Sequence, residues 1–407
     1  MTHELRYGTN STVRISLPED VILGDYRTPQ GDPLDDVSAA VAAALDAPID
    51  FPPLRRATVP GDRVAITIDQ GIPQLPYVLA GCIHSLTQDH IDPSDIRLIF
   101  ADQHDFEQTN LSDTLPTEIS AAIQISLHDP ANEKQVAYLA ASTDGQPIYM
   151  NRKVVEADVV LPISTFRLQD SFGYLGVHSG LFPTFADEKT QKRFRLAGVN
   201  EWREQFQRFC TETDEAAWLL GVLFTLQIVP GSGSSIIHVL AGDAHSVSAH
   251  GKTICDNVWR KQAPSRAALV VATIEGGPEQ QSWENLSRAL FSATQVVRDD
   301  GAIVLCTDLT RSPGTSLRRL SSSQTDDLLL REIRQNPSQD SLSAALLLEA
   351  RQRARVYLLS GLPADDVEQL GMACVTSEDE LDHLSQQFDS CILVSNAQQT
   401  ILTSAVD

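Results

Sequence analysis

The sequence of 407 residues is poor in cysteine and has no long hydrophobic run. Its six cysteines are scattered, with no Cys-x-x-Cys pair and no histidine at zinc-ligand spacing, so neither a disulfide framework nor a structural zinc site is indicated. The most apolar stretch, AAWLLGVLFTLQIVP, has roughly 15 residues, fewer than the ~20 needed to cross a bilayer. The first residues, MTHELRYGTN, lack the basic and apolar segments of a secretory signal. We therefore expect a cytoplasmic protein with reduced thiols.

Positive charge is also scarce. Lys and Arg together number 31 against 54 Asp and Glu, which gives a formal net charge of −23. Because such a field repels phosphate groups, we expect neither a nucleic-acid partner nor a membrane partner. The remaining partner class is a small molecule, and the composition says nothing about the oligomeric state.

Nucleotide-binding and hydrolase motifs are missing too. No Gly-x-Gly-x-x-Gly follows a predicted strand, which argues against an NAD-dependent dehydrogenase, and no Gly-x-Ser-x-Gly supports a serine hydrolase. The segment PGSGSS lacks the Lys-Ser/Thr pair that ends a phosphate loop. Because two apolar, β-rich runs flank it, this segment predicts a hairpin turn.

The feature that is present throughout is an alternation of strands and helices. Short apolar runs rich in β-branched residues predict strands at 63–69, 95–102 and 156–164, and a second series at 266–274, 301–308, 354–361 and 390–396. This spacing predicts βαβ units on mainly parallel sheets, hence an α/β fold. The length fits two domains, which we divide within KQAPSR into residues 1–262 and 263–407.

Ligands in such sheets bind at the carboxyl ends of the strands. Asp69, Asp102 and His104 occupy such positions, and so does the loop after Ser164. Further along this loop, FGYLGVHSGLF places three glycines in a short apolar segment. It either brings backbone close to a phosphate or cofactor, or is a tight turn between buried elements.

Several segments as a set resemble the nickel-pincer lactate racemase family. They are RYGTNSTVRISLP, PGDRVAITID, DGQPIYMNRKVVEADVVLPIS, HVLAGDAHSVSAHGK, EGGPEQQSWENLSRAL and VRDDGAIVLCTDL. The resemblance spans nearly the whole chain and implies two Rossmann-like domains with a cofactor in the cleft between them. It also implies that the two hands of a 2-hydroxy acid are interconverted by hydride transfer to the cofactor. That reaction needs a general base on each face and a cation for the carboxylate.

Two loops of the first domain keep part of the family pattern. The family's Asp-x-Thr-Arg-Pro is DQGIP here, which keeps Asp69 but has Ile72 in place of an arginine that would hold an anion. The family's Thr-Gly-Thr-His is ADQH, so His104 is a candidate catalytic base or a loop histidine without such a role. His128 belongs to a His-Asp pair that the family shares. It is either a further catalytic candidate or part of a capped turn before Pro130.

The cofactor-attachment loop departs further from the family. Aligned on Gly173 and Gly176, the chain has Gln169 at the position of a catalytic histidine. Ser179 replaces the lysine that carries the cofactor covalently, and a serine cannot form that amine linkage. His178 either ligates a metal or shuttles a proton, or it simply replaces a glycine. No nickel ligand is assigned, because no histidine occurs between His178 and His238.

In the second domain, Asn285 and Arg288 stand where the family directs a Gln and a Lys toward the cofactor. The predicted cofactor-binding set is therefore Asp69, Gly173, Gly176, Ser179, Asn285 and Arg288. Two functions remain open. The chain is a racemase or epimerase of a 2-hydroxy acid with an altered site, whose nickel-pincer nucleotide, if bound, is held non-covalently. Alternatively, it is an inactive relative that binds a small acid or phosphate and needs no cofactor.

Overall fold

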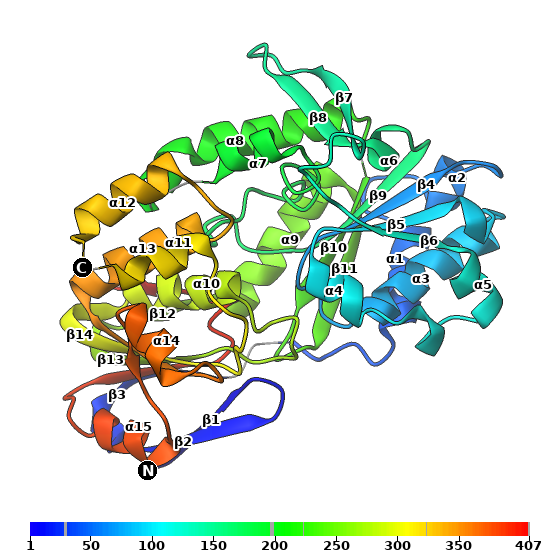
Figure 1. Cartoon of the computed structure of the whole chain (residues 1–407). Coiled ribbons are helices and arrows are strands. Elements are labelled where there is room, and N and C mark those ends of the chain that lie inside the picture. Colours follow the sequence, from blue (N-terminus) through cyan, green and yellow to red (C-terminus); the bar gives the residue numbers. More distant parts are fainter. Residues whose placement is uncertain (28–30, 196–198, 223, 323, 406–407) are drawn as a thin grey trace.

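The computed structural model of the chain describes residues 1–27, 31–195, 199–222, 224–322 and 324–405. Two six-stranded sheets, each flanked by helices, form the two halves of the molecule (Figure 1). The predicted α/β class and the mainly parallel sheets are confirmed. No helix in the described ranges is both long and apolar enough to span a bilayer.

The first sheet has the strand order β11-β10-β9-β4-β5-β6. Its strands are β4 (Val64–Ile68), β5 (Ile96–Phe100), β6 (Gln124–Leu127), β9 (Val159–Thr165), β10 (Phe224–Pro230) and β11 (Ile236–Asp243). All pairs are parallel except β10 with β11, which form the hairpin that PGSGSS predicts. Every residue of β4 and β10 is buried, as expected for strands covered on both faces.

Helices and a small hairpin cover the two faces of this sheet. The helices are α1 (Val37–Asp46), α2 (Leu54–Ala57), α3 (Leu75–Gln88), α4 (Gln103–Gln108), α5 (Thr117–Ala122), α6 (Arg152–Val155), α7 (Glu188–Phe194), α8 (Val199–Leu219) and α9 (Ala244–Trp259). The helices α1 and α3 pack against each other and supply one hydrophobic core. On the other face, Leu181, Phe182 and Phe185 pack with Ile148 and Met150 of the hairpin of β7 (Val136–Ala141) and β8 (Pro147–Asn151).

The second sheet is parallel throughout, with the order β16-β15-β14-β13-β17-β3. Its strands are β3 (Ile22–Tyr26), β13 (Ala267–Thr273), β14 (Val297–Cys306), β15 (Arg355–Leu359), β16 (Ala373–Cys374) and β17 (Cys391–Val394). Its helices are α10 (Trp283–Thr294), α11 (Thr315–Arg318), α12 (Asp326–Gln335), α13 (Ser341–Arg353), α14 (Ala364–Gln369) and α15 (Glu378–Ser385). Two further strand pairs are the antiparallel β1 (Thr2–Tyr7) with β2 (Ser11–Ser16) and the parallel β12 (Arg260–Ala263) with β18 (Ile401–Ser404).

The strand order corrects the division at residue 262. Strand β3 is the edge strand of the second sheet, beside β17, although it precedes the whole first sheet in the chain. The β1–β2 hairpin packs on the same sheet, because Leu5, Val13 and Ile15 share a core with Leu269 and Val271. The first 26 residues thus belong to the second domain, and the first domain is inserted after them. A five-residue edge strand carries no pattern that tells which sheet it joins.

The turn between β10 and β11 fastens the two domains together. The Ser234 hydroxyl donates to Glu279 (2.7 Å) and accepts from the Gly277 N–H (2.7 Å), while the Gly233 N–H donates to the Asn396 side chain (2.8 Å). The glycine- and serine-rich sequence of this turn therefore serves a domain contact in this structure.

Candidate functional site

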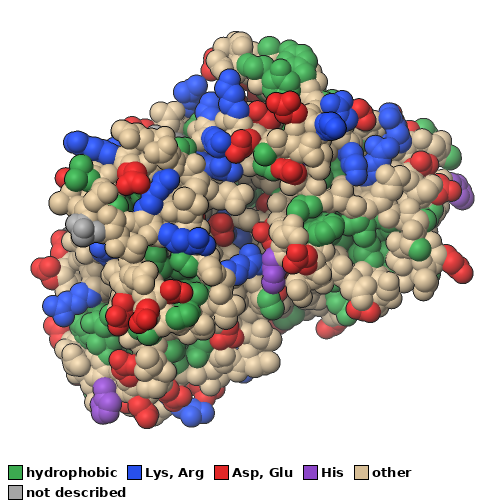
Figure 2. Space-filling model, viewed as in Figure 1, with side chains coloured by type: hydrophobic (Ala, Val, Ile, Leu, Met, Phe, Trp, Pro, Cys, Tyr) green, Lys and Arg blue, Asp and Glu red, His purple; other side chains and the backbone are tan. Residues whose placement is uncertain are grey.

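The carboxyl ends of both sheets meet at the boundary between the domains and enclose a cavity of about 20 Å³. Its lining residues are Gln70, Gly71, Asp102, Asp105, Arg167, Glu279, Ser282, Asn285, Arg288 and Arg311. On the face shown in Figure 2, side chains of both charge signs surround the hollow between the two halves. A volume of this size holds about one water molecule, so a ligand of several atoms requires the lining side chains to move outward.

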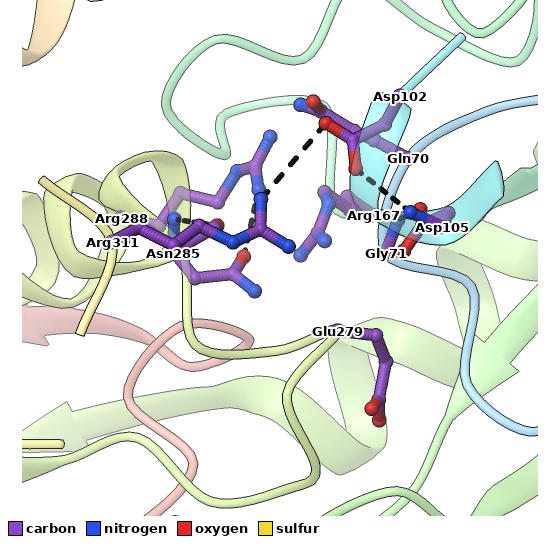
Figure 3. Close-up of a pocket in the computed structure, with 10 residues that line it drawn as sticks. Gln70, Gly71, Asp102, Asp105, Arg167, Glu279, Asn285, Arg288 and Arg311 are labelled. Atoms are coloured by element: carbon purple, nitrogen blue, oxygen red, sulfur yellow. Dashed lines mark hydrogen bonds and ion pairs between the residues drawn. The ribbon is translucent and has the colours of Figure 1, made fainter. Parts of the chain in front are cut away.

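The first domain supplies carboxylates to this cavity. Asp102 caps α4 by accepting hydrogen bonds from the N–H groups of His104 (3.0 Å) and Asp105 (3.1 Å). The Asp105 carboxylate is buried and accepts a hydrogen bond from the N–H of Gly71 (2.8 Å), which joins α4 to the loop after β4. Figure 3 shows these aspartates on the side of the cavity opposite Arg288 and Arg311.

The second domain supplies arginine and amide groups from the first two turns of α10. Ser282 caps this helix by accepting from the Asn285 N–H (3.2 Å), which fixes where the helix begins. Asn285 and Arg288, three residues apart, then lie on one face. The Arg288 guanidinium donates to the Asn285 side-chain oxygen (2.8 Å) and to the Phe172 carbonyl (3.3 Å).

Two further arginines line the cavity. Arg167, in the loop after β9, is 8% exposed and donates to the side chain of Gln399 (2.6 Å) and the carbonyl of Gln398 (3.4 Å). Arg311, in the loop after β14, lies with Nη1 3.9 Å from an Asp102 oxygen. Three guanidinium groups from three separate segments therefore share one small cavity.

Burial shifts the pKa values of two carboxyl groups at the site, Asp69 and Asp105. Burial raises the pKa of Asp69, and the nearby charges of Arg288 and Arg167 oppose this increase. Burial also raises the pKa of Asp105 to about 7, with the Asp102 charge adding to the effect and the Gly71 hydrogen bond acting against it. A carboxyl group that titrates near neutral pH can both donate and accept a proton there.

The structure brings together only part of the predicted site. Asn285 and Arg288 line the cavity, and Asp69 interacts electrostatically with Arg288. His104 stands in the first turn of α4 but is not one of the lining residues, and its buried Nε2 has no hydrogen-bond partner.

His128 lies away from the cavity and is held within the fold. The Asn151 amide nitrogen can only donate, so His128 Nδ1 accepts its hydrogen bond (3.0 Å) and Nε2–H donates to the Ala186 carbonyl (2.9 Å). Both ring nitrogens are thus used, and burial lowers the pKa of His128. Among its two interpretations, this geometry favours the structural one.

His178 faces a different region. Its Nδ1 bonds to Asp214 of α8 (2.9 Å), and its buried Nε2 has no partner. It lines a second cavity of about 340 Å³ between the loop after β9, α8 and α9. Of the small cavity's lining residues, the second cavity shares only Arg167.

The residues of the predicted attachment loop do not fit a covalently held pincer cofactor. The Ser179 hydroxyl donates to the Gly176 carbonyl of its own turn (2.7 Å). Gly173 and Gly176 adopt φ of +76° and +101°, and a Cβ on Gly176 would meet nothing within 4 Å, so these glycines serve the turn itself. Within the described parts of the chain, no three His, Cys, Asp or Glu side chains converge as metal ligands.

Sequence reasoning missed Asp105, Arg167 and Arg311. Each stands within a few residues of the carboxyl end of a strand, which is the signal that could have found them. The sequence pattern does not show which polar residue near a strand end points into the cavity, because this depends on the path of each loop.

Comparisons with known proteins agree on the architecture. Residues 7–206 match the family model of the lactate racemase N-terminal domain. The structure resembles the lactate racemase apoprotein from Thermoanaerobacterium thermosaccharolyticum, with a TM-score of 0.79, 17% identity, and coverage of 99% of this chain and 100% of that one. It also resembles a protein from Thermotoga maritima, with a TM-score of 0.65, 15% identity, and coverage of 92% and 99%. No curated protein matches the sequence.

Proposed function

Because this chain belongs to the lactate racemase-like family, we propose that it binds a small 2-hydroxy acid, or a similarly small anion, in the cavity between its domains. The observation that carries the proposal is the convergence of Arg167, Arg288 and Arg311. Ile72 stands where the family has an arginine in the loop after β4. Among the residues that line the cavity, Arg167, Arg288 and Arg311 are therefore the cations that can hold a carboxylate.

The partners of these arginines support an anion site. Arg167 donates to an amide oxygen and a carbonyl, and Arg288 does the same, so within the described residues neither donates a hydrogen bond to a carboxylate. The contact of Arg311 with Asp102 is 3.9 Å long, which is an ion pair but too long for a hydrogen bond. Each guanidinium carries five N–H donors, so several are left for ligand oxygens.

Calorimetric titration with glycolate, lactate and phosphate tests this proposal. Replacing Arg288 or Arg167 by Gln removes a charged donor, which is worth about 1.5–3 kcal/mol. We therefore expect affinity to fall about tenfold to a hundredfold. Arg14→Gln is the matched control, since Arg14 is an exposed β2 residue paired with Glu4. The proposal is contradicted if Arg288→Gln and Arg167→Gln bind the anions as tightly as the control Arg14→Gln does. It is also contradicted if the protein binds none of the three anions.

Racemase or epimerase activity on a 2-hydroxy acid is the finer form of the same proposal. It is supported by the family and by Asp105, a carboxyl group able to exchange protons near neutral pH. Chiral chromatography of D- and L-lactate after incubation measures it, using protein produced with and without a supply of the pincer nucleotide and analysed for nickel. If the acid binds but its optical composition stays constant in both samples, the chain is a binding relative.

We also propose a cytoplasmic location. It is supported by the six cysteines, which form no disulfide in this structure.

A further inference from the structure

Among the carboxylates that line the small cavity, only Asp105 is both buried and hydrogen-bonded to the loop after β4. It is 7% exposed, on α4, and one of its oxygens is taken by the Gly71 N–H at 2.8 Å. Asp105 lines the same small cavity as the three arginines. A ligand anion held by Arg167 and Arg288 must therefore lie near this carboxyl group.

Burial is the largest cause that raises the pKa of Asp105, the Gly71 hydrogen bond opposes it, and the surrounding charges act in addition. Asp102 on the same helix and Glu279 from the loop before α10 repel a negative charge, and Arg311 from the loop after β14 attracts it. His104 adjoins it in the chain, and Asp69 lies beyond Gly71 in the loop after β4. Arg311 is shared with Asp102, so it compensates Asp105 only in part. With burial added, the pKa of about 7 leaves the group half protonated at neutral pH.

We propose that Asp105 couples binding of the anion to uptake of one proton, and thereby selects acids that carry an oxygen beside the carboxylate. The bound anion brings a further negative charge into a cavity that already holds carboxylates, so the proton enters from solvent onto Asp105. The neutral carboxyl then donates a hydrogen bond to the hydroxyl or keto oxygen of the ligand, while the guanidinium groups hold its carboxylate. This inference rests on the proposed function and specifies its ligand class.

The variant Asp105→Asn separates this role from a structural one. The asparagine oxygen can still accept from the Gly71 N–H, and its NH₂ group can donate to the ligand as a protonated carboxyl would. It cannot titrate. Asp379→Asn, on the exposed surface of α15, is a control with the same change of charge.

Calorimetric titrations of glycolate and acetate at pH 6, 7 and 8, in buffers of different ionisation enthalpy, give both affinity and proton uptake. With a pKa of about 7, the protonated fraction falls about tenfold between pH 6 and pH 8. We expect glycolate affinity to fall by up to that factor, with about half a proton taken up per ligand at pH 7. Glycolate should bind more tightly than acetate. Asp105→Asn should bind glycolate equally at all three pH values without proton uptake, whereas Asp379→Asn should behave like the unmodified chain.

The outcomes distinguish the two proposals. Binding without proton uptake, or an unchanged pH dependence in Asp105→Asn, overturns the coupling and leaves the anion site standing. Equal affinity for glycolate and acetate overturns the selection of an oxygen substituent. If neither acid nor phosphate binds at any pH, the anion site fails and the coupling fails with it.

Discussion

Gly180 is the point at which the glycine-rich loop touches the strand ends that lead to the site. A Cβ at this position would lie 2.6 Å from the Cβ of Ser164 and 3.0 Å from the Cβ of Asp69. Ser164 cannot move easily, because it is buried in β9 and its hydroxyl is hydrogen-bonded to Gln227 (2.8 and 3.0 Å). The same Gln227 amide donates to the Val177 carbonyl (3.0 Å), which holds the loop against the sheet. The substitution Gly180→Ala therefore forces either the loop or the strand end to shift.

The expected cost of Gly180→Ala is about 1–3 kcal/mol of unfolding free energy, the usual range for an overpacked core. For a domain of this size, each kcal/mol lowers Tm by about 2–4 °C. The shift should also move Asp69 and weaken ligand binding. Urea unfolding followed by tryptophan fluorescence and circular dichroism measures the stability.

A second substitution tests the cause. Ser164→Gly removes the atom that the new methyl group would meet at 2.6 Å, so Gly180→Ala should cost less in that background, although Ser164→Gly is itself destabilising. If Gly180→Ala leaves the protein as stable as before, or costs the same in both backgrounds, close packing is not the reason for glycine at this position.

Two further predictions concern buried titratable groups. Burial lowers the pKa of His128, so the unfolded chain, with a histidine pKa of ~6.5, binds the proton more readily, and stability should fall as pH drops below that value. His128→Gln should reduce the difference between the unfolding free energies at pH 5.5 and 7.5, and should leave glycolate affinity unchanged; an undiminished difference refutes this assignment. Cys374 is half-buried whereas the other five cysteines are buried, so an aromatic disulfide reagent should label about one thiol in the native protein and six after unfolding. Rapid labelling of several native thiols contradicts the described packing.

The central strands could be predicted from the sequence because burial on both faces demands continuous apolar runs. RVAITID and RAALVVATI became β4 and β13, and both lie within the sheets. The edge strand β3, with the sequence ILGDY, is only partly buried and carries no such signal. Its membership in the second sheet depends on a contact across more than 360 residues, between Ile22 and Cys391, which local patterns cannot encode.

The candidate site was predictable where a resemblance supplied positions. Asn285 and Arg288 were found because they stand where the family directs a Gln and a Lys toward the cofactor. Arg167 and Asp105 were not found, since their directions follow from a loop and a short helix whose paths depend on tertiary contacts. For His128, the sequence left two interpretations open. A histidine at a strand end is a reasonable catalytic candidate, yet Asn151 and Ala186 occupy both its nitrogens here.

The placement of β3 has a consequence for how the molecule bears mechanical load. The strands β1 and β2 pack on the second sheet and β3 joins it. The last strand, β18, pairs with β12 beside this sheet, so the first and the last strands are anchored in the same domain. Tension applied between the two ends acts on the second domain, and the inserted first domain carries little of it. Cutting the chain near residue 262 would also strip the second sheet of β3 and expose β17 as a new unpaired edge, the kind of surface that promotes aggregation.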